Sequence, residues 1–144
     1  MSVVLIAGSR KLVGQPFYDY MYEFVSTFPK DTVFLSGMAD GVDIYGYRAA
    51  TVLGHRVKEM PIEDWEWDED VHARRAGLVR DYCLGIYVQK SKDGHAHLFI
   101  NNSQLTAGTK LMKGICEEFL VPYTLHNCTF SPDELKQRVT NWRR

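Results

Sequence analysis

The stretch "TVFLSGMADGVDIYGYRAATVL", from Thr32 to Leu53, has the pattern of a strand, a polar loop and a helix in succession. Its first four residues are mostly apolar and β-prone, which predicts a strand buried on both faces. Residues 42–53 have the spacing of a helix, and Gly54 follows them as a stop signal. A polar loop with two glycines joins the two elements. A strand that breaks into such a loop before a helix is typical of sites for small polar ligands.

The same alternation of strand and helix continues in both directions along the chain. Strands are predicted over residues 3–7, 32–35, 56–60, 97–100 and 121–125, and helices over 16–28, 42–53, 72–85, 108–119 and 131–142. Residues 86–88 are interpreted as a possible additional short strand. The pattern predicts one α/β domain over residues 1–144. We expect a Rossmann-like, doubly wound, mostly parallel sheet flanked by helices, with the ligand site at the carboxyl ends of the strands.

Composition limits the kinds of partner. The 144 residues are 45% hydrophobic and carry a formal net charge of −1, so we expect one core and no cationic field for nucleic acid. No apolar run approaches the roughly 20 residues of a membrane span, and no signal peptide is apparent. Cys83, Cys116 and Cys128 are odd in number and widely spaced. We therefore expect a cytoplasmic protein without a membrane partner, disulfide, bound metal or cofactor.

Two further loops follow predicted strands at the same edge of the sheet. In "AGSRKLVG", Gly8 allows close approach of a ligand, Ser9 offers a hydrogen bond, and Arg10 a planar donor group for phosphate or carboxylate. In "NNSQLTAGTK", a helix start follows several small polar residues. A phosphate is expected there, with Lys110 as counter-charge. Its predicted binding residues are Thr106, Gly108 and Thr109.

The loop in the opening stretch has two interpretations. In the first, backbone amides near Ser36, Gly37 and Gly41 face a polar ligand, and Asp43 binds a ribose hydroxyl or a base edge. In the second, Asp40 only caps the helix. Carboxylates at this helix start disfavour a bare phosphate there, because they already neutralise the positive end of the helix dipole.

Five short motifs occur along the chain in a characteristic order. They are Gly8, Ser9 and Arg10; Ser36, Gly37, Ala39, Gly41 and Asp43 as S-G-x-A-x-G-x-D; Trp65; Ala76, Gly77 and Arg80 as A-G-x-x-R; and Thr106, Gly108 and Thr109 at a helix start. Together they resemble the SLOG superfamily (the SMF/DprA and LOG group), and within it the small YspA-like proteins. The resemblance implies a Rossmann-like fold that binds a nucleotide or nucleotide-derived molecule. The residues expected around the ligand are Gly8, Ser9, Arg10, Ser36, Gly37, Gly41, Asp43, Arg80, Thr106, Gly108 and Thr109.

The resemblance is incomplete at the position that matters for catalysis. The LOG phosphoribohydrolases resemble P-G-G-x-G-T-x-x-E, whose glutamate is needed to cleave the sugar–base bond, and here Met112 occupies that position. Asp43 is the tentative replacement, with Asp40 and Asp64 as alternatives. The leading hypothesis is thus a sensor or sequestering protein. The alternative is an N-glycoside hydrolase or deoxyribosyltransferase acting on nucleotides.

Three weaker hypotheses concern other parts of the chain. Arg74, Arg75, Arg80 and the terminal "NWRR" leave DNA binding in the manner of DprA open, against the near-neutral charge. His95 and His97 alternate on one strand face without a nearby partner for metal binding, so solvated histidines are the favoured interpretation. Aromatic residues nearly all round the first helix predict a homodimer or larger homo-oligomer.

Overall fold

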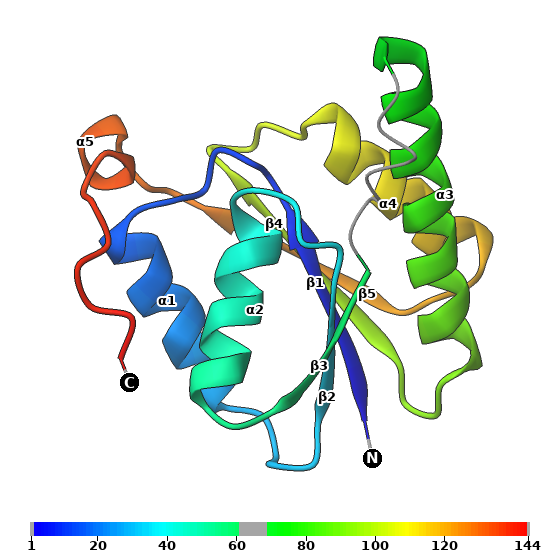
Figure 1. Ribbon diagram of the computed structural model, residues 1–144, viewed down its shortest axis with the longest axis horizontal. Coiled ribbons are helices and arrows are strands. Elements are labelled where there is room, and N and C mark those ends of the chain that lie inside the picture. The colour runs from blue at the N-terminus through cyan, green and yellow to red at the C-terminus, as the bar shows by residue number, and fades with distance from the viewer. Residues whose placement is uncertain (1, 61–68, 144) are drawn as a thin grey trace.

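The computed structural model of the chain describes residues 2–60 and 69–143, with the backbone alone described over 69–77. Ten elements follow one another (Figure 1). They are β1 (Val3–Gly8), α1 (Gln15–Ser26), β2 (Val33–Ser36), α2 (Val42–Val52), β3 (Arg56–Glu59), α3 (Glu69–Lys90), β4 (His95–Asn101), α4 (Ala107–Glu118), β5 (Tyr123–Cys128) and α5 (Pro132–Leu135).

The five strands form one sheet in the order β3-β2-β1-β4-β5. All four pairings are parallel. The Rossmann-like α/β prediction is confirmed, and the sheet is wholly parallel rather than mostly so. From β1 the chain winds outward to β3 and then returns to the other side of β1 with β4. Ligands of such sheets bind at this reversal, outside the carboxyl ends of β1 and β4.

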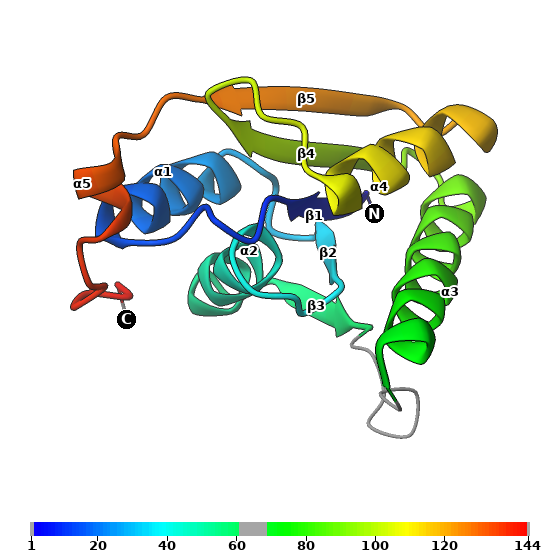
Figure 2. The same cartoon turned by 90° about the horizontal axis from the view of Figure 1, so that it is seen from above.

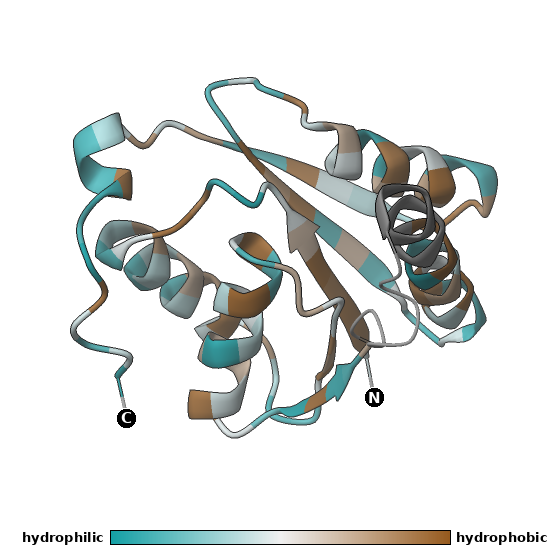
Figure 3. Ribbon diagram, turned by 45° about the horizontal axis from the view of Figure 1, so that its top comes forward, coloured by the Kyte–Doolittle hydropathy of each residue, from teal (hydrophilic) through white to brown (hydrophobic). Residues whose placement is uncertain are grey.

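Two helical layers cover the sheet (Figure 2). Helices α1 and α2 pack on one face, and α3 and α4 on the other. The central strand β1 is apolar along its length, as a doubly covered strand must be (Figure 3). Gly46 lets α2 approach β1 closely, because a Cβ there would lie 2.7 Å from Cγ2 of Ile6.

Three sequence predictions of secondary structure were wrong in part. Residues 86–88 are not a strand but belong to α3, because Leu84 and Val88 bury one helical face while Ile86 is exposed. The fifth strand begins two residues late, at Tyr123, because Pro122 has no N–H to donate to a neighbouring strand. The carbonyl of Pro122 still accepts a hydrogen bond from the amide of Ala96.

The terminal helix is much shorter than predicted. It begins where expected, with Ser131 and Glu134 forming a capping box, but it ends at Leu135 instead of residue 142. Beyond it, the Gln15 side chain accepts hydrogen bonds from the amides of Thr140 and Asn141, both at 2.9 Å. Contacts with α1 thus replace the intrahelical hydrogen bonds that would have continued α5.

The aromatic residues of α1 have partners inside the chain. Phe17 and Tyr18 are fully buried, and the Tyr18 ring lies 4.7 Å from that of Trp142. Phe24 packs against the rings of His97 and His126 on β4 and β5. Tyr20 is 39% exposed. The excess of aromatic residues is therefore explained without a second subunit, and the homo-oligomer stays a prediction.

Two other sequence predictions concern membranes and thiols. Among the described residues, no helix has both the length and the apolar character needed to cross a bilayer. All three cysteines are free, with Cys83 exposed and the other two buried.

Candidate functional site

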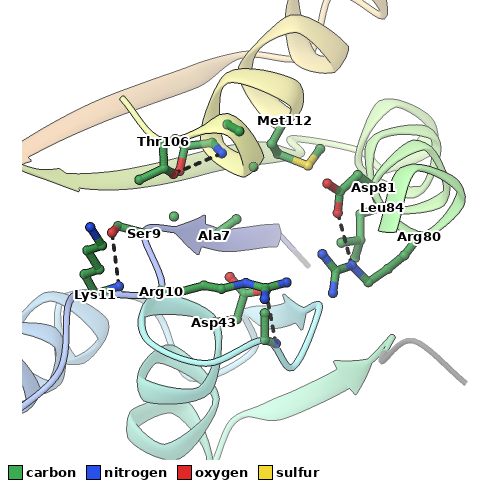
Figure 4. A pocket seen from close by; sticks show the side chains of 15 residues that line it. Ala7, Ser9, Arg10, Lys11, Asp43, Arg80, Asp81, Leu84, Thr106 and Met112 are labelled. Carbon is green, nitrogen blue, oxygen red and sulfur yellow. Dashed lines mark hydrogen bonds and ion pairs between the residues drawn. The ribbon is translucent and has the colours of Figure 1, made fainter. Parts of the chain in front are cut away.

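A pocket of ≈ 320 Å³ lies at the reversal between β1 and β4 (Figure 4). Four parts of the chain form it: the end of β1, the start of α2, one face of α3 and the first turn of α4. Eight of the predicted ligand-binding residues line it, namely Gly8, Ser9, Arg10, Asp43, Arg80, Thr106, Gly108 and Thr109. The pocket is also lined by Ala7, Lys11, Ala39, Asp81, Leu84, Ala107 and Met112.

The loop after β1 is held tightly against β4. Any side chain at Gly8 would overlap the backbone oxygen of Phe99, so only glycine fits there. The amide of Ser9 donates to that same oxygen at 3.0 Å, and the Ser9 hydroxyl accepts from the amide of Lys11 at 3.2 Å. These contacts fix the base of the loop, which presents the exposed side chains of Arg10 and Lys11 to the pocket.

The start of α2 packs against the loop that follows β1. Its N-cap is Gly41 with φ 78°, and no side chain caps it, so the interpretation of Asp40 as N-cap was wrong. A Cβ at Gly41 would lie 2.6 Å from Cα of Arg10, and the amide of Val42 donates to the Ser9 carbonyl at 3.2 Å. The two loops therefore dock on each other. The amide of Val42, in the first turn of α2, therefore faces protein atoms rather than a ligand.

Ser36 and Gly37 also have structural roles and do not line the pocket. The Ser36 hydroxyl donates to the carbonyl of Asp43 at 3.0 Å and accepts from the amide of Met38 at 3.1 Å. A Cβ at Gly37 would lie 2.8 Å from Oδ2 of Asp43. These two residues position Asp43 instead of contacting the pocket directly.

Asp43, Arg80 and Asp81 form a charged cluster at one end of the pocket. The Nε of Arg80 donates to Oδ1 of Asp81 at 3.1 Å, and its NH1 donates to the carbonyl of Gly37 at 3.3 Å. Both carboxyl groups are nearly inaccessible to solvent, with relative exposures of 5% for Asp43 and 7% for Asp81. The cluster therefore places one guanidinium among two buried carboxyl groups.

Burial raises the pKa of both carboxyl groups. The pKa of Asp43 rises to about 7, although the charge of Arg80 and amide donors from Ala39 and Gly8 act in the opposite direction. Burial also raises the pKa of Asp81, against the charges of Arg80 and Arg10. Near neutral pH, Asp43 can therefore exist in either protonation state.

The start of α4 differs from that of α2 because it opens into the pocket. Thr106 is its N-cap and accepts from the amide of Thr109 at 3.4 Å. Gly108 follows in the first turn, and a Cβ there would meet no atom within 4 Å. The first amides of a helix have no acceptor inside it. An anion in the pocket is therefore best placed here.

Several site residues were missed or misassigned from the sequence. Lys11, rather than Lys110, is the lysine that lines the pocket. Asp81 carried no motif, and only its position next to Arg80 pointed to it. In the polar loop after β4, the Asn101 side chain donates to the carbonyl of Phe130, and the Ser103 hydroxyl accepts from the side chain of Asn127 in β5. Predictions involving Asp64, Trp65, Arg74, Arg75, Ala76 and Gly77 fall outside the residues whose side chains are described.

Met112, which the sequence resemblance aligns with the glutamate of the LOG phosphoribohydrolases, lines the pocket with 2% exposure. A thioether can pack against a ligand but cannot accept or donate a catalytic proton. Within the described part of the chain, no three His, Cys, Asp or Glu residues come together as a metal site.

No protein-family model matches this chain, and no significant match was found among curated proteins or solved structures.

Proposed function

We propose that the chain binds a nucleotide or nucleotide-derived small molecule in this pocket, as a sensor or sequestering protein of the SLOG type. The observation that carries the proposal is the pairing of an open α4 start with a buried carboxyl–guanidinium cluster in one pocket. The helix start suits a phosphate, while Asp43, Arg80 and Asp81 suit the hydrogen-bonding groups of a ribose or base. Leu84 and Met112 provide apolar surface for a planar base.

The experiment is a binding screen with analysis of the bound and released molecules. The purified protein is incubated with nucleoside mono-, di- and triphosphates, NAD, ADP-ribose and cyclic nucleotides, and small molecules are identified by mass spectrometry. A ligand at a hundredfold excess over its Kd raises the free energy of unfolding by about 2.7 kcal/mol, which a thermal shift detects. The proposal is wrong if no nucleotide in the panel shifts the melting temperature.

Two lysine variants make the screen specific to this site. Lys11→Ala removes a cation that lines the pocket, whereas Lys110→Ala removes an exposed one that does not. We expect the first to weaken binding of phosphorylated ligands about tenfold and the second to leave it nearly unchanged. Equal effects of the two variants would mean that the ligand binds elsewhere.

The second candidate function is N-glycosidic cleavage of a nucleotide. It is favoured by the buried Asp43 carboxyl, whose pKa of about 7 suits proton transfer near neutral pH. Met112 in the hydrolase glutamate position opposes it. Release of free base that disappears in Asp43→Asn would establish this function, and intact substrates across the panel would exclude it for those substrates.

DNA binding has less support. Arg80 lies in the pocket, and Arg143 of the terminal basic segment pairs with Glu23 at 3.2 Å and Asp19 at 3.7 Å. These two cations are therefore committed to contacts within the chain.

A cytoplasmic location stays part of the proposal, since free thiols suit a reducing compartment.

A further inference from the structure

A second, smaller cavity of ≈ 170 Å³ adjoins the pocket. The two share Ser9, Lys11 and Thr106 in their walls. The remaining walls come from the loop after β4 and from the segment around α5. These are Asn101, Asn102, Gln104, Phe130, Pro132 and Leu135. The C-terminal segment of this chain thus takes part in a cavity that opens beside the nucleotide pocket.

Hydrogen bonds hold the walls of the second cavity in place. The Asn101 side chain accepts from the amide of Phe130 at 2.8 Å and donates to its carbonyl at 3.0 Å. The capping box of Ser131 and Glu134 then sets the direction of α5, which carries Pro132 and Leu135. Because both walls are tied together, the cavity exists before any ligand arrives.

Charge is distributed unevenly along the first pocket. Figure 4 shows Arg80 and Asp81 toward one end, while Lys11 and Thr106 lie toward the other. Only that second end borders the smaller cavity. At the first end, the charges of Arg80 and Arg10 act on the buried carboxyl group of Asp81, so cations and carboxyl groups offset each other there. Lys11 and the start of α4 favour a phosphate at the second end. Phosphates are therefore directed to the boundary between the two cavities.

A group attached beyond those phosphates would enter the second cavity. Asn102 and Gln104 offer side-chain amides that both donate and accept hydrogen bonds, and Phe130 offers a half-buried ring. Such walls suit an uncharged group with several hydroxyls. Together the cavities have about one and a half times the volume of the first alone. The first alone is at the low end of the roughly 300–1,000 Å³ of typical ligand sites.

We propose that the ligand is two-ended: a nucleoside in the first pocket, a diphosphate beside Lys11, and a second, sugar-like group in the cavity walled by the C-terminal segment. This inference rests on the proposed function and specifies the class of nucleotide that the site prefers.

The test compares ligands of increasing length on one variant pair. Calorimetric titrations use AMP, ADP and ADP-ribose, and in parallel GMP, GDP and GDP-mannose. Gln104→Trp fills the second cavity from an exposed position, and Gln89→Trp makes the same exchange at an exposed position on α3. In at least one series, we expect the sugar-bearing diphosphate to bind the unchanged protein about tenfold more tightly than the monophosphate.

The variants then assign that gain to the second cavity. Gln104→Trp should abolish the gain while leaving monophosphate affinity unchanged, and Gln89→Trp should preserve both. Equal affinities for the diphosphate with and without its sugar, or a gain that survives in Gln104→Trp, would overturn the inference and leave nucleotide binding intact. If none of the six compounds binds while another nucleotide in the screen does, the inference alone is wrong. Absence of any binding across the full panel would reject both proposals.

Discussion

Helices α2 and α4 begin at the same edge of the sheet, and each follows a polar loop, but their first turns serve different purposes. At α2, the amide of Val42 donates to Ser9, and Gly41 is packed against the backbone of Arg10. At α4, Gly108 faces open space in the pocket. The start of α2 is where two loops pack together, and the start of α4 is a candidate anion site. Similar local sequences therefore do not imply similar availability to a ligand.

The largest expected effect concerns Asp43, which places a buried carboxyl group in the first turn of α2. Its pKa in the folded chain, about 7, lies above the usual 3.8. The stability due to the neutral carboxyl is therefore complete below about pH 4 and is lost as the pH rises through 7. Asp43→Asn keeps a neutral side chain at all pH values. Each pKa unit corresponds to about 1.4 kcal/mol, so between pH 4 and 8 the variant should gain several kcal/mol relative to the unchanged protein.

The measurement is the free energy of urea unfolding of both proteins across this pH range. His97 changes the free energy of unfolding with pH in the opposite direction. Burial lowers the pKa of His97 to about 4, so acid favours the unfolded chain, in which this side chain is protonated more readily. This contribution is common to both proteins and cancels in their difference. A difference that does not change with pH would show that Asp43 is ionised throughout.

A smaller effect on stability is expected when the packing between the two loops is disturbed. Gly41→Ala combines a positive φ of 78° with overlap against Ser9 and Arg10, and should lower the free energy of unfolding by roughly 3 kcal/mol. Gly54→Ala is the matched control, because its φ is 83° but a Cβ there meets nothing within 4 Å. The control should cost about 1 kcal/mol. Equal costs in urea unfolding would mean that loop docking contributes little.

The smallest change in stability is expected at α4, together with a change in binding. Gly108→Ala and Gly114→Ala each add a methyl group that meets no protein atom, so both should stabilise the helix by about 0.5–1 kcal/mol. Only Gly108 lines the pocket. We expect its variant to weaken binding of any ligand found in the nucleotide screen, and the Gly114 variant to bind normally. Normal binding by both would place the ligand away from the first turn of α4.

Local sequence patterns were sufficient for most of the secondary structure, and eight of the predicted ligand-binding residues line one pocket. The continuous apolar run of β1 and the cap at Thr106 depend on neighbouring residues, so they could be predicted from the sequence. The end of α5 could not, because Gln15, over a hundred residues earlier, holds Thr140 and Asn141 outside a helix. Capping sets where a helix can begin, but tertiary contacts can decide where it ends.

The sequence by itself determined that strands and helices alternate, and that polar loops with glycines lie where parallel strands end. Only the tertiary structure decided which of those loops stay open. Gly41 packs against Ser9 and Arg10, more than thirty residues earlier, and Asp81 reaches the pocket from a helix far along the chain. Lys11, rather than Lys110, lines the pocket for the same reason. Backbone amides and charges are available to a ligand only if no other part of the chain uses them, and that depends on contacts far apart in sequence.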